Sequence, residues 1–135
     1  MKELNDRLQA KYKQIEAAEA RWEEIECDDA EYIIVAFGSS ARICSATVEA
    51  ARAEGIKLGQ LRTITLWPFP QQPIAELAER GVKGFLSVEL NAGQMVEDVR
   101  LAVNGKAQVE HFGATGGMMV SPDDVLAELK NKFVK

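Results

Sequence analysis

The sequence has 135 residues, of which 47% are hydrophobic and 27% charged, values that are typical of one folded domain and exclude a mostly disordered chain. Sixteen Lys and Arg against 21 Asp and Glu give a formal net charge of −5, which disfavours nucleic acid and anionic membranes as partners because no excess of positive charge is available to neutralise phosphates. The apolar runs are far shorter than the ~20 residues of a membrane-spanning helix, and the polar, charged N-terminus does not resemble a signal peptide.

The cysteine and histidine content limits metal and redox chemistry. The chain has two cysteines, Cys27 and Cys44, and one histidine, His111, too few for a zinc site or an iron–sulfur cluster built from this chain alone. A disulfide stays possible, but without a secretory signal we expect free thiols and a cytoplasmic location. Cys44 falls within a predicted helix, where we expect a small buried apolar residue.

A long amphipathic helix is predicted over residues 3–26. Its apolar side chains recur at spacings of three and four, with charged residues between them. They are Leu4, Leu8, Tyr12, Ile15, Ala18, Trp22 and Ile25. A helix of about 24 residues is ~36 Å long, more than the remaining domain can cover. Either this row of apolar side chains packs along its own domain, or part of it contacts another partner.

Strands and helices alternate after this first helix. The apolar run 32–37 fits a strand buried on both faces of a sheet, and the pattern from Ser121 to Asp124 is typical of a helix start. The alternation predicts an α/β fold, a three-layer αβα open sheet that is mostly parallel. Strands are predicted at 32–37, 57–66, 84–89 and 107–112, and helices between 40 and 55, at 73–80, from 95 to 104 and after 121.

Ligands and partners of such sheets approach the carboxyl ends of the strands, where four loops are expected. The first carries Gly38, Ser39, Ser40 and Arg42 at the start of a helix. Free backbone N–H groups there favour an anion cradle, and the alternative is a serine N-cap beside a surface arginine. The sequence matches neither the dinucleotide nor the P-loop fingerprint.

The second loop places Trp67 and Phe69 between prolines. Proline stiffens a loop, and aromatic side chains on a stiff loop are typical of a protein interface. The alternative is that both rings cover the core of their own domain.

The third and fourth loops carry acidic, amide and glycine residues. Glu89, Asn91 and Gln94 follow a strand, and a buried Glu89 is expected to accept hydrogen bonds from the next helix rather than to act as a general acid or base, because no second carboxylate or histidine lies at a recognisable spacing. Gly116 and Gly117 lie in a flexible loop without lysine, a weak phosphate site. No Ser/His/Asp or Cys/His set is recognisable, so we expect no catalytic residue.

Three segments taken in order resemble the alpha subunit of the 2-oxoacid:ferredoxin oxidoreductases, of the 2-ketoisovalerate or 2-oxoglutarate type. They are 63–70, 88–95 and 113–117, with 38–42 and 52–59 in agreement. The resemblance extends from about Leu8 to the last helix. It implies a domain similar to the C-terminal domain of transketolase at residues 29–135, and a connector helix at 1–28 that joins it to an N-terminal domain absent from this sequence.

Members of this family use thiamine diphosphate to decarboxylate a 2-oxoacid, form an acyl-coenzyme A and pass electrons through iron–sulfur clusters to ferredoxin. The resemblance implies that the thiamine diphosphate residues lie in the preceding domain and in a beta subunit, since the Gly-Asp-Gly signature is absent here. It therefore implies a domain that binds no metal or cofactor itself and is inactive alone. Its implied partners are the N-terminal domain of alpha, the beta and gamma or delta-type subunits, and, through the complex, ferredoxin.

The substrate class follows from the resemblance alone. Residues 89–96 look closest to the 2-ketoisovalerate type, which we therefore favour over 2-oxoglutarate. One hypothesis is that Arg42 meets an anionic group of the substrate. The alternatives are a stand-alone anion-binding module and a pure interaction domain.

Overall fold

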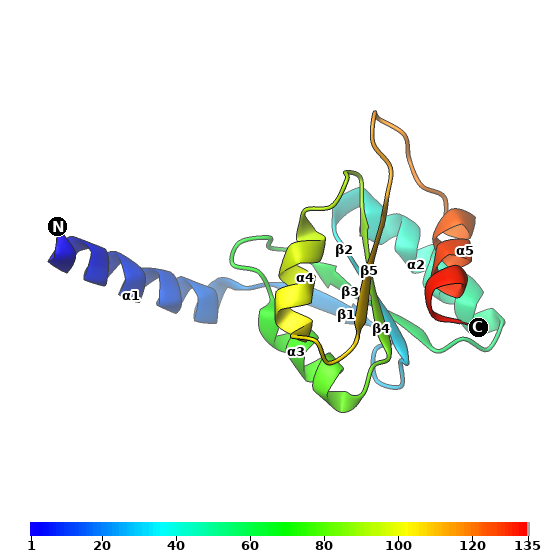
Figure 1. The fold of residues 1–135 in the computed structure, drawn as a ribbon, viewed down its shortest axis with the longest axis horizontal. Helices are drawn as coiled ribbons and strands as arrows, with labels where there is room; N and C mark the ends of the chain where they lie inside the picture. Colours follow the sequence, from blue (N-terminus) through cyan, green and yellow to red (C-terminus); the bar gives the residue numbers. More distant parts are fainter. Residues whose placement is uncertain (135) are drawn as a thin grey trace.

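A computed structural model describes residues 1–134, and Lys135, the last residue of the predicted domain, lies outside the described residues. A five-stranded sheet with the order β1-β3-β2-β4-β5 forms its centre (Figure 1). The last four strands along the chain pair in parallel, and β1 adds to the edge of β3 in the antiparallel direction. The strands are β1 (Trp22–Ile25), β2 (Tyr32–Ala36), β3 (Leu58–Thr63), β4 (Gly84–Glu89) and β5 (Gln108–Gly113).

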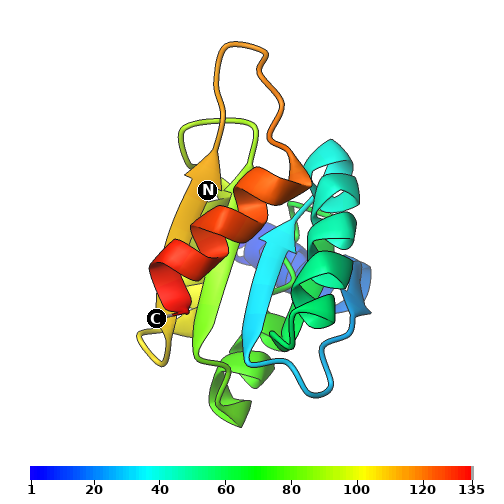
Figure 2. The same cartoon turned by 90° about the vertical axis from the view of Figure 1, so that its right-hand side faces the viewer.

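Helices cover both faces of the sheet. One core lies between the sheet and the pair α2 and α5, and the other lies between the sheet and the pair α3 and α4 (Figure 2). The predicted three-layer αβα architecture is therefore confirmed. The helices are α1 (Lys2–Glu19), α2 (Gly38–Ala53), α3 (Gln71–Arg80), α4 (Met95–Val103) and α5 (Pro122–Phe133).

Strand β2 shows why the sheet has two buried faces. Successive side chains of a strand point to opposite faces. Ile33 and Val35 accordingly enter the core under α3 and α4, while Ile34 and Ala36 enter the core under α2 and α5. All four are fully buried, as the continuous apolar run predicts for a central parallel strand.

The predicted helix 3–26 is wrong beyond Glu19. The helix ends there, and Trp22–Ile25 forms β1, with Trp22 paired to Thr63 and Ile25 paired to Gln60. Trp22 and Ile25 continue the helical spacing, but this local pattern is overridden because the free edge of β3 supplies backbone partners for a strand. No residue of α1 is buried, and the helix projects away from the body (Figure 1).

The carboxyl ends of the parallel strands lie at one edge of the sheet. The connection from β4 to α4 and the connection from β5 to α5 both emerge at this edge, and the second protrudes beyond the rest of the molecule (Figures 1 and 2). Within residues 1–134, no helix has the length and apolar character needed to cross a membrane.

Candidate functional site

The residues predicted to form a site lie in three separate places. One set lies at the start of α2, a second lies in a groove under α1, and a third lies where β4 and β5 end. The structure therefore does not bring the predicted residues into one cavity.

A groove of about 430 Å³ lies at the start of α2. Gly38, Ser39 and Arg42 line it, but Ser40 is buried in the body of the domain. Arg62 on β3 brings a second guanidinium, which pairs with Glu23 over 3.3 Å. The full lining is Glu23, Ile25, Gly38, Ser39, Ala41, Arg42, Ser45 and Arg62.

The first turn of α2 has no side-chain cap. Phe37 stands at the N-cap position and gives no side-chain hydrogen bond, so the predicted serine cap is not formed. The first N–H with an intrahelical acceptor is that of Ala41, which donates to the carbonyl of Phe37 over 3.3 Å. Backbone N–H groups at the helix start and the guanidinium of Arg42 carry positive charge in this groove, while Arg62 is already paired with Glu23.

Gln60 holds α2 against the sheet. Its side chain is fully buried in β3. Its Nε2 donates to the carbonyl of Ala41 over 2.8 Å, and its Oε1 accepts from the hydroxyl of Ser45 over 3.2 Å. We did not predict this contact, although a glutamine in the middle of a predicted strand is the kind of buried polar residue that needs a partner.

The second place is a wide groove between the second half of α1 and the proline-rich loop. Trp67 is 59% exposed and meets the ring of Tyr12 edge-on, with 5.9 Å between ring centroids. Phe69 is half-buried and packs against the core under α3 and α4. The loop was expected either to form a protein interface or to cover its own core. Phe69 covers the core, whereas Trp67 faces outward.

In the third place, Glu89 caps α4. Its carboxylate is completely buried and accepts from the backbone N–H groups of Gln94, Met95 and Val96 over 3.1, 2.6 and 3.1 Å, and from the hydroxyl of Ser87 over 3.1 Å. These four bonds occupy both oxygens. The predicted structural interaction of Glu89 with the next helix is observed, and the carboxylate has no free position for acid–base chemistry.

The remaining predicted residues of these loops have local roles. Asn91 accepts the N–H of Gly93 on its Oδ1 over 2.7 Å, an Asx turn, and the side chain of Gln94 is exposed. Gly116 and Gly117 adopt φ angles of 69° and 78° in the protruding loop, a conformation that favours glycine.

The structure assembles a serine, a histidine and a carboxylate that the sequence spacing did not reveal. Ser87 and His111 are register partners on β4 and β5, and His111 Nε2 lies 3.7 Å from Glu89 Oε2. Ser87 is fully buried and donates to Glu89 rather than to the histidine. The three residues therefore do not form a nucleophilic triad, in which the serine must bond the histidine and be open to substrate.

Metal binding finds no support in the described part of the chain. Residues 1–134 contain no group of three or more His, Cys, Asp or Glu side chains placed to hold a metal ion. Both cysteines are free and buried, and burial raises the pKa of Cys27 to about 11 and that of Cys44 to about 12.

Comparison with known proteins identifies relatives among 2-oxoacid oxidoreductases. Residues 30–125 match the family model of pyruvate:ferredoxin oxidoreductase core domain II. Ketoisovalerate oxidoreductase subunit VorB of Methanothermobacter thermautotrophicus is 48% identical over 130 residues, which are 96% of this chain and 36% of VorB. 2-Oxoglutarate synthase subunit KorA of Methanothermobacter marburgensis is 37% identical over 102 residues, 76% of this chain and 27% of KorA.

Two solved structures share the fold. A 2-oxoglutarate:ferredoxin oxidoreductase from Magnetococcus marinus superposes with a TM-score of 0.75 at 20% identity, covering 88% of this chain and 21% of that one. A split-gene transketolase superposes with a TM-score of 0.70 at 19% identity, covering 82% of this chain and 40% of that one. The chain spans about a third of the length of the VorB relatives that it matches. With a family model matched over most of its length and a transketolase-like fold, this chain belongs to the pyruvate:ferredoxin oxidoreductase core domain II family.

Proposed function

We propose that this chain is the C-terminal assembly domain of a 2-ketoisovalerate:ferredoxin oxidoreductase, an enzyme that oxidatively decarboxylates a 2-oxoacid to an acyl-coenzyme A and reduces ferredoxin. The observation that carries the proposal is the 48% identity with VorB over 130 residues. The 37% identity with KorA over 102 residues is lower and covers less of the chain, which favours 2-ketoisovalerate over 2-oxoglutarate as the substrate.

The cofactors of such an enzyme belong on other parts of the complex. An iron–sulfur cluster needs about four thiolates, and this chain has two, both buried and held in their protonated form by raised pKa values. The residues present do not fit a cluster. Thiamine diphosphate is proposed to bind to a preceding domain and a beta subunit, since the Gly-Asp-Gly signature is absent here and the carboxylate of Glu89 is already fully hydrogen-bonded.

The partners are proposed to meet this domain at α1 and at the groove beside Trp67. Helix α1 has no buried residue, and Trp22, Leu66, Trp67 and Leu101 give the groove exposed apolar side chains. Of the connector expected at residues 1–28, helix α1 would then join this domain to a domain equivalent to the part of VorB that this chain does not match, since β1 already belongs to the sheet. The beta and gamma or delta-type subunits are the other proposed partners, with ferredoxin reached through the complex.

The groove at the start of α2 is proposed to face an anionic group of the substrate or of coenzyme A. Exposed Arg42 and the uncapped N–H groups of the first turn support this placement. The same features support the alternative of a stand-alone anion-binding module, for which inorganic phosphate and coenzyme A would bind to the isolated chain.

Reconstitution tests the proposal. We expect the chain, coexpressed with the unmatched N-terminal part of a VorB subunit and its companion subunits, to copurify with them and to restore dye reduction that depends on coenzyme A and on 2-ketoisovalerate. Trp67→Ala should weaken copurification, and Met118→Ala, on the protruding loop, is the matched control. Absence of copurification, or higher activity with 2-oxoglutarate, would contradict the proposal, and thiamine diphosphate binding by the isolated chain would contradict the cofactor placement.

A further inference from the structure

His111 contains an unpaired polar atom in the interior. Its Nε2 is the one buried side-chain nitrogen or oxygen, among residues 1–134, without a hydrogen-bond partner. Buried polar atoms in native proteins are normally hydrogen-bonded. Whether Nε2 carries a proton or a lone pair must therefore follow from the groups around it. The carboxylate oxygen Oε2 of Glu89 lies 3.7 Å from it.

The carboxylate determines which nitrogen carries the proton. Glu89 is fully buried and receives four hydrogen bonds from the other side, an arrangement that stabilises its negative charge. A lone pair on Nε2 would face this charge across a short distance in a medium of low dielectric, which is repulsive, whereas an N–H dipole is attracted. The proton of the neutral ring therefore belongs on Nε2.

Two glycines confine the imidazole ring. A Cβ atom added to Gly93 would lie 3.6 and 3.7 Å from His111 Cδ2 and Cγ, and one added to Gly113 would lie 3.1 Å from Nε2. The ring is thus enclosed between the loop before α4 and the end of β5, and its orientation towards Glu89 is set by packing on two sides.

The second ring nitrogen, Nδ1, faces outward. The His111 side chain keeps 22% of its surface exposed. Nδ1 forms no hydrogen bond with the described residues. Unlike Nε2, it is not fully buried, so it reaches the solvent. The ring lies beside Gly93, in the connection after β4, and Gly113, at the end of β5.

We propose that Glu89 positions His111 as a proton-accepting site: Nε2 carries the proton, and Nδ1 presents its lone pair to solvent beside the connection 90–94. The site takes a ligand or a neighbouring chain that offers an O–H, S–H or N–H donor. Glu89 acts as a positioning residue, since it orients the ring without facing the ligand.

Nitrogen NMR of the wild-type chain tests the proton position directly. His111 is the only histidine, so the two ring nitrogens of the uniformly ¹⁵N-labelled protein give one unambiguous pair of signals. At a pH where the ring is neutral, we expect Nε2 to show a protonated shift and Nδ1 an unprotonated one. A proton on Nδ1, or two tautomers in equal amounts, would overturn the proposal.

Modification with diethylpyrocarbonate, which acylates an unprotonated imidazole nitrogen, tests access to Nδ1. His111 should be modified at Nδ1, and Glu89→Gln, which removes the carboxylate that orients the ring and raises its basicity, should slow this reaction about tenfold. The control is Glu97→Gln, which changes an exposed carboxylate in the first turn of α4. It should leave the rate of modification unchanged. A native chain whose His111 resists modification, or an unchanged rate in a folded E89Q, refutes the site. If E89Q does not fold, the nitrogen NMR and the modification of the wild-type chain decide.

Discussion

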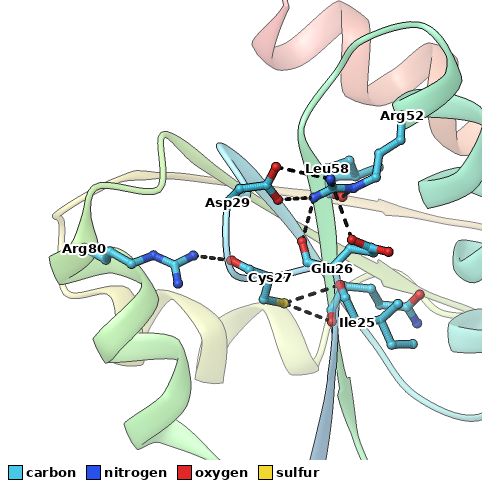
Figure 3. Close-up of polar contacts among 8 residues, drawn as sticks. Ile25, Glu26, Cys27, Asp29, Arg52, Leu58 and Arg80 are labelled. Atoms are coloured by element: carbon cyan, nitrogen blue, oxygen red, sulfur yellow. Dashed lines mark hydrogen bonds and ion pairs between the residues drawn. The ribbon is translucent and has the colours of Figure 1, made fainter.

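Arg52 and Asp29 form a two-pronged ion pair, in which the guanidinium donates to both carboxylate oxygens over 2.7 and 3.3 Å (Figure 3). Asp29 lies in the turn between β1 and β2, and Arg52 lies in the last turn of α2. The same guanidinium donates to the main-chain carbonyls of Glu26 and Leu58 over 2.7 and 2.8 Å. One side chain therefore ties the turn after the edge strand to α2 and to β3.

Replacement of Arg52 should destabilise the domain. Arg52→Met keeps an apolar stem and removes the donors to two carbonyls and a carboxylate, so we expect the free energy of unfolding to fall by about 2 kcal/mol. Urea unfolding followed by circular dichroism measures this loss. Arg100→Met, which removes an exposed pair with Glu97, should cost less than about 0.5 kcal/mol, and equal losses in both variants would contradict the role of Arg52.

The same ion pair should make stability depend on pH. The hydrogen bond from Arg52 lowers the pKa of Asp29 below its ordinary value of 3.8. A carboxyl group with a depressed folded-state pKa contributes stability above the unfolded-state pKa and loses it as the pH falls through the folded-state value. The stability difference between wild type and Asp29→Asn should be constant near neutral pH and shrink below about pH 4. Urea titrations across this range, showing a gap that widens instead, would refute the linkage.

The two thiols should be inert in the folded chain. At pH 8, pKa values of about 11 and about 12 leave a thiolate fraction of roughly one in a thousand or less, and burial blocks access as well. Ellman's reagent should label both cysteines at least about 100-fold more slowly in buffer than in denaturing urea. Rapid labelling of either cysteine in buffer would show that its burial is not maintained in solution.

Trp67 should control the position of α1. The helix has no buried residue, and the edge-on contact between Tyr12 and Trp67 is worth about 1 kcal/mol. Trp67→Ala should therefore raise amide hydrogen exchange in α1 about fivefold, while exchange in the sheet stays unchanged. Leu101→Ala, which removes another exposed side chain of the same groove, is the control, and unaltered exchange in α1 of W67A would disprove the anchoring contact.

Gly113 should not tolerate a side chain. A Cβ atom there would lie 2.6 Å from the carbonyl oxygen of Asn91 and would overlap the carbonyl of Glu89 as well. Since both are backbone atoms, they cannot turn aside, and Gly113→Ala should lower the free energy of unfolding by about 2–3 kcal/mol. Gly117→Ala, where φ is +78° but space is open, should cost about 1 kcal/mol. Thermal melts that rank G117A as the less stable variant would contradict this packing.

The order and type of most elements could be predicted because their signals are local. The apolar run of β2, the Ser121–Asp124 capping box, in which both reciprocal bonds are present, and the glycine at the end of α3, with a φ of 105°, each depend on residues within a few positions of one another. The contact of Glu89 with the next helix belongs to the same class, because its backbone partners lie only five to seven residues further along the chain.

What the sequence by itself determined is therefore the alternation of strands and helices, their caps and the resemblance to a family. Only the tertiary structure decided that Trp22–Ile25 is a strand, since its partner β3 lies about forty residues away. It also decided that Gln60 holds α2 and that Ser87, Glu89 and His111 meet. These contacts join segments that are distant in the chain. Their register is set only when the strands pair in the folded sheet, so no local periodicity predicts them.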